Sequence, residues 1–232
     1  MVHHLITYLC IIGLGVILLT IFYFMLGKFT NKLPETWRTL AQLKNFKLSI
    51  LFFLIYLLIN LIGEIVAVYL AMHRTYNSFV ISINQTLSTP FLYGFLFVHT
   101  HTYWKRYIYL LLYLILPIYL IQGDYYNPNC NLPGVWPLIL NSTYFLAALV
   151  HLTDLLMNPK SESFGFRLKV NICILICTLL AAILTSFEWA DSMNKPSHPE
   201  VIFYIHLYNI VLYYFALDLI FINEIRKLRH AL

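Results

Sequence analysis

The sequence predicts an all-α membrane protein built as a bundle of seven transmembrane helices. The composition is the first observation: 60% of the residues are hydrophobic and 11% are charged, whereas soluble domains contain about 25% charged residues. The second is a series of seven apolar runs long enough to cross a bilayer as helices, at about 5–26, 48–72, 79–98, 107–122, 135–157, 168–187 and 201–222. Because every connection is short, residues 1–232 form one transmembrane domain.

The third observation is the placement of lysine and arginine, which predicts the orientation. They follow the first, third, fifth and seventh runs, and only Arg74 and Lys195 fall on the other side. By the positive-inside rule, the N-terminus lies outside and the C-terminus in the cytoplasm, as in a multi-pass protein of the cell inner membrane. The net charge of +5 then reflects topology and contact with anionic lipid, and it indicates no nucleic-acid partner.

The first run carries Gly13 and Gly15 but no acidic or basic side chain, which indicates close helix packing. The basic connection after it contains Pro34 and Trp37, with Phe46 among its apolar positions. This pattern predicts a short amphipathic helix lying in the head-group region, or a linker lying flat there.

The second and third runs are joined by residues 73–78 and therefore form a tight helical hairpin. Asn60 and Glu64 lie one turn apart in the second run, and Asn84 and Gln85 precede Pro90 in the third. Polar groups at this depth are costly in lipid, so they mark a functional site or interhelical hydrogen bonds.

The later runs supply further polar side chains at helical spacing. The fourth run is short and aromatic and has no acidic, basic or histidine side chain. The fifth carries Asn141, His151 and Asp154, and the sixth carries Asn171. The seventh carries His206, Asn209 and Asp218. At about 100° per residue, Asp218 points nearly opposite Asn209, so the two halves of this helix are expected to contact different neighbours.

The rise of ~1.5 Å per residue sorts these groups into two layers. An outer chamber is predicted for Asn60, Glu64, Asn84, Gln85, Asn141, His206 and Asn209. An inner polar layer is predicted for His151, Asp154, Asn171 and Asp218. In the inner layer we expect structural ion pairs, in which Asp154 and Asp218 use Lys160, Arg167 or Arg226 as partners.

The preferred function is binding, and translocation, of a small polar or cationic solute in the outward-facing chamber, with Glu64 as the charged contact. The equally weighted alternative for Glu64 is a hydrogen bond to Gln85 or His206 that only joins helices. Two other functions stay open: a helix-packing subunit of a membrane complex, and an intramembrane enzyme acting on a lipid or isoprenoid. The expected partners are accordingly the bilayer, a solute or cation, and other membrane subunits.

Catalysis is the less favoured reading, because the sequence contains no Gly-rich phosphate loop, Gly-x-Ser-x-Gly elbow or His-Glu-x-x-His motif. No catalytic residue, metal or cofactor is predicted. The four cysteines have neither metal-ligand spacing nor a disulfide pattern, and Cys130 stands alone in an outer loop. The seventh run lacks a lysine, which disfavours a retinal Schiff base.

Thr89-Pro90 lies in an aromatic third run, Tyr93-Gly94-Phe95-Leu96-Phe97 following it. In this dipeptide and in its seven-run topology, the sequence resembles a group of uncharacterised bacterial seven-helix inner-membrane proteins. The resemblance implies the seven-helix fold and the inner membrane, and it implies no activity.

Overall fold

A computed structural model describes residues 2–32, 39–73, 78–98, 105, 107–111, 114, 135–157, 164–194 and 199–231. The helices over these residues are α1 (Val2–Lys32), α2 (Thr39–Met72), α3 (Ser78–Phe97), α5 (Val135–Met157), α6 (Phe164–Asn194) and α7 (Pro199–Ala231). Residues 105, 107–111 and 114, in the predicted fourth run, are also helical. The described chain is therefore all-helical.

Five of these helices contain a segment that is long and apolar enough to cross a membrane. The segments are Leu9–Lys28, Asn45–Leu70, Leu138–Met157, Gly165–Phe187 and Leu207–Arg229. Each coincides with a predicted run, because a stretch of about 20 apolar residues can satisfy its backbone in lipid only as a helix. The chain is a multi-pass membrane protein.

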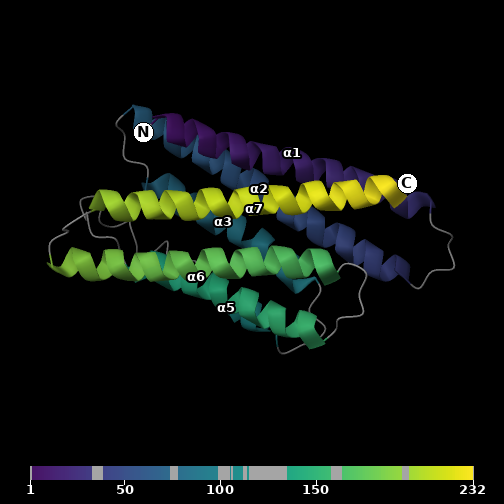
Figure 1. Cartoon of the computed structure of the whole chain (residues 1–232). Coiled ribbons are helices and arrows are strands. Elements are labelled where there is room, and N and C mark those ends of the chain that lie inside the picture. The colour runs from purple at the N-terminus through teal and green to yellow at the C-terminus, as the bar shows by residue number, and fades with distance from the viewer. Residues whose placement is uncertain are drawn as a thin grey trace.

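The helices lie side by side in an elongated bundle (Figure 1). α2 packs closely against α3, and α5 against α6, while α1 contacts both α2 and α7, and α7 contacts α6. The first and last helices of the chain are thus neighbours. The two termini lie at opposite ends of the bundle (Figure 1).

Side-chain contacts give the relative directions of the helices. Thr89 of α3 meets Tyr144 of α5, and six residues further along α3 the Phe95 ring lies 6.3 Å from the ring of His151. The two helices therefore run in the same direction. The end of α3 therefore lies at the opposite end of the bundle from the start of α5.

The start of the fourth run lies against α5 in the reverse direction. Lys105 contacts Asp154, and the hydroxyl of Tyr109 donates to the carbonyl oxygen of Ala147 at 3.3 Å. As the chain advances from residue 105 to 109, its contacts on α5 move back by seven residues. The described part of this run is consequently antiparallel to α5.

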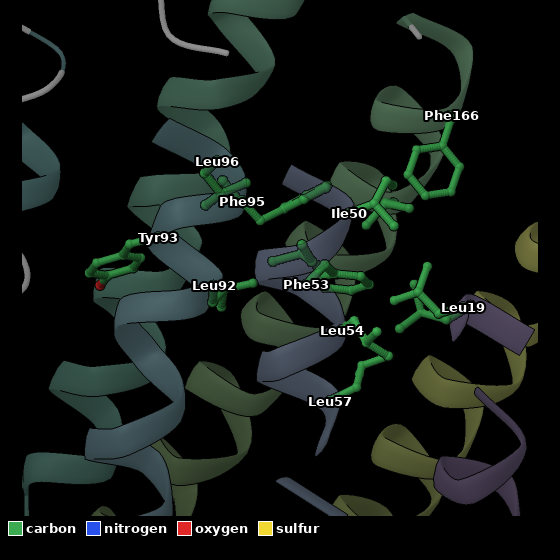
Figure 2. Close-up of a cluster of buried hydrophobic side chains, with 14 of the residues drawn as sticks. Leu19, Ile50, Phe53, Leu54, Leu57, Leu92, Tyr93, Phe95, Leu96 and Phe166 are labelled. Atoms are coloured by element: carbon green, nitrogen blue, oxygen red, sulfur yellow. The ribbon is translucent and has the colours of Figure 1, made fainter. Parts of the chain in front are cut away.

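An aromatic core fills the centre between α1, α2, α3, α6 and α7. The Phe53 ring lies 4.8 Å from Phe95 and 6.3 Å from Phe221. Figure 2 shows side chains of α1, α2 and α3 converging around Phe53, with Tyr93 on the opposite side of α3. Large apolar side chains meet here because each helix turns one stripe inward and leaves the rest for lipid.

The predicted amphipathic helix between the first two spans is wrong for the residues that are described. α1 continues to Lys32 and α2 already begins at Thr39, so residues 39–47 belong to the same helix as the second span. Phe46, expected among head groups, is buried and packs edge-on against Phe22 and Phe166 at 6.3 and 5.6 Å. Burial of this ring, in a segment without glycine or proline, favours continuation of the helix.

Candidate functional site

Four buried polar residues gather at the end of the bundle where most of the basic residues lie, and we call them the basic-end cluster: Lys105, His151, Asp154 and Arg167. Lys105 Nζ lies 2.8 Å from Asp154 Oδ1, and the two side chains are 4% and 3% exposed. Arg167, three residues into α6, is buried and acts electrostatically on the same carboxylate. Asp154 thus acts on both cations.

His151 lies inside this cluster and is fully buried. The charged groups that act on its ring are Arg167, Asp154 and Lys105. Neither of its ring nitrogens has a hydrogen-bond partner among the described residues. Asn171 of the neighbouring helix α6 donates to the Ala148 carbonyl of α5 at 3.0 Å. The side-chain oxygen of Asn171 is buried and has no hydrogen-bond partner among the described residues.

Asp218 forms a separate centre halfway along α7. Its side chain is 2% exposed, and neither carboxylate oxygen has a hydrogen-bond partner in the described part of the chain. It faces α1 at Gly15, where an added Cβ would lie 2.7 Å from Asp218 Oδ1. The missing side chain at Gly15 is therefore what lets the carboxylate enter between the helices.

Toward the other end of the bundle, polar contacts link four helices in what we call the outer polar row: Asn84, Asn60, Tyr56, Tyr213, Cys177 and Asn209. Asn84 of α3 donates to Asn60 Oδ1 of α2 at 3.4 Å, and Asn60 donates to the Tyr56 carbonyl at 2.8 Å. The side chains of Tyr56 and Tyr213 of α7 interact with one another, and Asn209 donates to the Cys177 carbonyl of α6 at 3.1 Å. Apart from the bond within α2, these contacts join helices.

Three members of the predicted outer chamber, Asn60, Asn84 and Asn209, belong to this row. Asn84 packs directly on Gly63, so that an added Cβ there would overlap the amide. Its Oδ1 and the nearby Gln85 Oε1 are buried without hydrogen-bond partners among the described residues. Glu64 and Asn141 are half-buried, and the side chain of His206 lies outside the described part. The chamber itself stays a prediction.

The predicted ion pairs of the inner layer are only partly right. Asp154 is paired as expected, but its close partner is Lys105, which the sequence placed in a connection. For Asp218 the expected pair with Arg167 or Arg226 is not found, and the carboxylate faces α1 at Gly15. Lys160 lies outside the described residues.

The structure confirms one expectation about α7 and changes another. Asn209 contacts α6 and Asp218 contacts α1, which confirms that the two halves address different neighbours. The helix is longer than predicted, however, and its last two turns contain Lys227. That lysine is 59% exposed and lies 2.8 Å from Glu224, so it points away from the bundle interior.

Sequence reasoning missed Lys105, Tyr56 and Tyr213 as members of these centres. Lysine at the end of an apolar run and tyrosine inside one look ordinary in a membrane protein. The available signal for Lys105 was its position next to an apolar run facing Asp154, which becomes visible only when the helix neighbours are known. Cys10, Cys173 and Cys177 are free thiols, and Cys130 lies outside the described residues.

No group of three His, Cys, Asp or Glu side chains in the described ranges is arranged to hold a metal ion. Comparisons of the sequence with protein-family models and with curated proteins, and of the structure with solved structures, found no match. Function must therefore be argued from the buried polar groups themselves.

Proposed function

We propose that this protein binds a small cation or polar solute inside its helical bundle and translocates it, with Asp218 as the charged contact at mid-bundle. One observation carries the proposal: both oxygens of a carboxylate that is 2% exposed have no hydrogen-bond partner among the described residues. A buried charge without compensation is costly. A small cation, or a solute that donates hydrogen bonds, supplies what the carboxylate lacks.

The surroundings of Asp218 favour a small occupant. On the α1 side it meets the backbone at Gly15, and bulky apolar residues flank it along α7, where Leu217 and Phe221 are fully buried. A compact cation can be held by a carboxylate and backbone oxygens in such a space, whereas a large solute would need the helices to separate. We therefore propose a monovalent cation or a small ammonium compound as the ligand of Asp218.

The predicted outer chamber fits this proposal as the entrance. Gln85 Oε1 and Asn84 Oδ1 offer buried acceptor oxygens without partners in the described part of the chain, and Glu64 lies on α2 one residue beyond Gly63, on which Asn84 packs. A solute that leaves water would meet these oxygens before it reaches Asp218. The chamber residues are retained here as the proposed outer layer.

The orientation and the number of crossings are part of the proposal. We place the N-terminus outside, the C-terminus in the cytoplasm and the protein in the inner membrane, with seven crossings. The support is that α3 and α5 run in the same direction while residues 105–109 run against α5. One further crossing between α3 and α5 gives seven, which matches the opposite placement of the two termini in Figure 1.

The test uses purified protein in a neutral detergent and a panel of chloride salts: sodium, potassium, ammonium, methylammonium and guanidinium. Ionic strength is held constant with N-methylglucamine chloride, whose cation is too large for the site. Thermal unfolding is followed by circular dichroism. A ligand at ten times its Kd should stabilise the folded state by about 1.4 kcal/mol.

Asp218→Asn should abolish that response, because the amide keeps the shape but removes the charge. Glu224→Gln is the matched control: the same change on the same helix, at a carboxylate that pairs with Lys169 and Lys227, should respond like wild type. Uptake of the stabilising cation by proteoliposomes then tests translocation. The proposal is abandoned if no cation stabilises wild type, or if Asp218→Asn responds as wild type does.

A further inference from the structure

We infer that the cation bound at Asp218 is a small alkylammonium ion that keeps two or three N–H groups, such as methylammonium or dimethylammonium, and not an alkali metal ion. The inference rests on the proposed function and names the chemical class of its ligand. It follows from what the contact between α1 and α7 offers around Asp218, which is one carboxylate among apolar side chains.

The first argument is the scarcity of oxygen ligands around Asp218. Residues 11–19 of α1, one turn to either side of Gly15, are all glycine, valine, leucine or isoleucine. Within one turn of Asp218 on α7, the only other oxygen-bearing side chain is that of Tyr214. Sodium and potassium ions must replace a hydration shell of several oxygens, as rings of carbonyl groups do in channels. One carboxylate, even with carbonyls that already accept from their own helix, replaces too few of them.

The second argument is the apolar wall around the carboxylate. Ile12 and Leu19 lie one turn before and after Gly15, and Phe221 lies one turn after Asp218; all three are fully buried. Spacings of three and four residues place them on the same helix faces as Gly15 and Asp218. Methyl groups of a ligand are buried favourably against such side chains. A metal ion has no apolar surface to bury.

The third argument is the number of hydrogen-bond donors. Oδ1 and Oδ2 of Asp218 are both buried without hydrogen-bond partners among the described residues, and no charged group in that part of the chain acts on the carboxylate. A primary or secondary ammonium ion brings one positive charge and an N–H group for each oxygen. Ammonium and guanidinium carry further N–H groups that would point at apolar side chains without an acceptor, which is costly. Tetramethylammonium has no N–H group to donate.

The experiment measures the Kd of each cation for purified protein in neutral detergent, from the rise of the unfolding temperature with concentration, followed by circular dichroism. The chloride salts are those of sodium, potassium, guanidinium, ammonium, methylammonium, dimethylammonium and tetramethylammonium. Tetraethylammonium chloride, whose cation is large and has no N–H group, keeps the ionic strength constant. We expect methylammonium to bind about fourfold more tightly than ammonium, because one methyl group is buried, and tetramethylammonium to give no stabilisation.

Ile12→Thr and Ile12→Val test the apolar wall directly. Threonine and valine have nearly the same shape, but threonine adds a hydroxyl oxygen one turn from Gly15. In Ile12→Thr the preference for methylammonium over ammonium should fall to about twofold or less, because the hydroxyl can accept a further N–H group. In Ile12→Val the preference should stay as in wild type. Since the measured quantity is a ratio of two Kd values within one variant, a change of stability that affects both cations equally cancels.

The outcomes separate this inference from the proposed function. Sodium, potassium or guanidinium bound at least as tightly as methylammonium would overturn the ligand class and leave the cation site in place. Equal ratios in Ile12→Thr and Ile12→Val would also overturn it, because the apolar wall would then have no part in the preference. A wild-type protein that responds to no cation, or an Asp218→Asn protein that responds as wild type does, would remove the proposed function and this inference with it.

Discussion

Replacement of Gly15 by alanine should destabilise the contact between α1 and α7. The added Cβ would lie 2.7 Å from Asp218 Oδ1, well inside the ordinary carbon–oxygen contact distance. Forcing extra atoms into a packed interior costs about 1–3 kcal/mol. Against this, alanine in place of glycine favours a helix by roughly 0.5–1 kcal/mol.

Gly13→Ala measures that helical gain by itself, because a Cβ at Gly13 meets nothing within 4 Å. The difference between the two variants should therefore isolate the clash, at about 1–3 kcal/mol in favour of Gly13→Ala. Equilibrium unfolding in mixed micelles with increasing SDS, followed by circular dichroism, gives both free energies against wild type.

A double-mutant cycle assigns the difference to Asp218. In an Asp218→Ala background no carboxylate remains to clash, so Gly15→Ala and Gly13→Ala should become equivalent within about 0.5 kcal/mol. If the two glycine variants already agree within that margin in the wild-type background, the carboxylate does not lie against Gly15 and the reasoning about the α1–α7 contact fails.

Four other substitutions test the remaining contacts in the same unfolding assay. Asp154→Leu should cost about 3–5 kcal/mol, because it leaves buried Lys105 without its close partner and removes the carboxylate that acts on Arg167, and adding Lys105→Met should recover part of the loss; an additive double variant would contradict the buried pair. Gly63→Ala should cost about 1–3 kcal/mol through overlap with Asn84, and a persisting cost in an Asn84→Ala background would rule this cause out. Asn209→Leu should cost about 0.6–2 kcal/mol by removing the bond to the Cys177 carbonyl; a more stable variant would argue against that bond. Lys227→Ala, at an exposed ion pair, should change stability by less than about 1 kcal/mol, and a larger loss would mean that this lysine does not point outward.

The apolar runs predict the spans well because lipid leaves a polypeptide few choices. Val135–Met157 matches its run at both ends, since polar turn residues flank it. The start of α2 was missed by nine residues, because residues 39–47 mix basic and apolar side chains in a pattern that suits both a head-group helix and an extended span. Only the burial of Phe46 against Phe22 and Phe166 distinguishes these two outcomes.

The polar residues could be found from the sequence, but their partners could not. Helical spacing correctly separates Asn209 from Asp218 by face. Which helix each face meets depends on the packing order, and that order places Gly15 opposite Asp218 although the two are about 200 positions apart. Lys105 and Asp154 meet for the same reason. A pattern read along one helix carries no information about the neighbour across it.

The adjacency of α1 and α7 also has a consequence for biogenesis. A ribosome that adds about 5–20 residues per second needs roughly 10–40 s to go from Gly15 to Asp218. α1 can wait in the lipid for that time, because it has no acidic, basic or amide side chain between Leu9 and Gly27, and the Thr20 hydroxyl donates to Val16 of its own helix at 2.7 Å. α7, which carries the carboxylate, emerges after the other described helices and can pack against α1, which is already in the membrane.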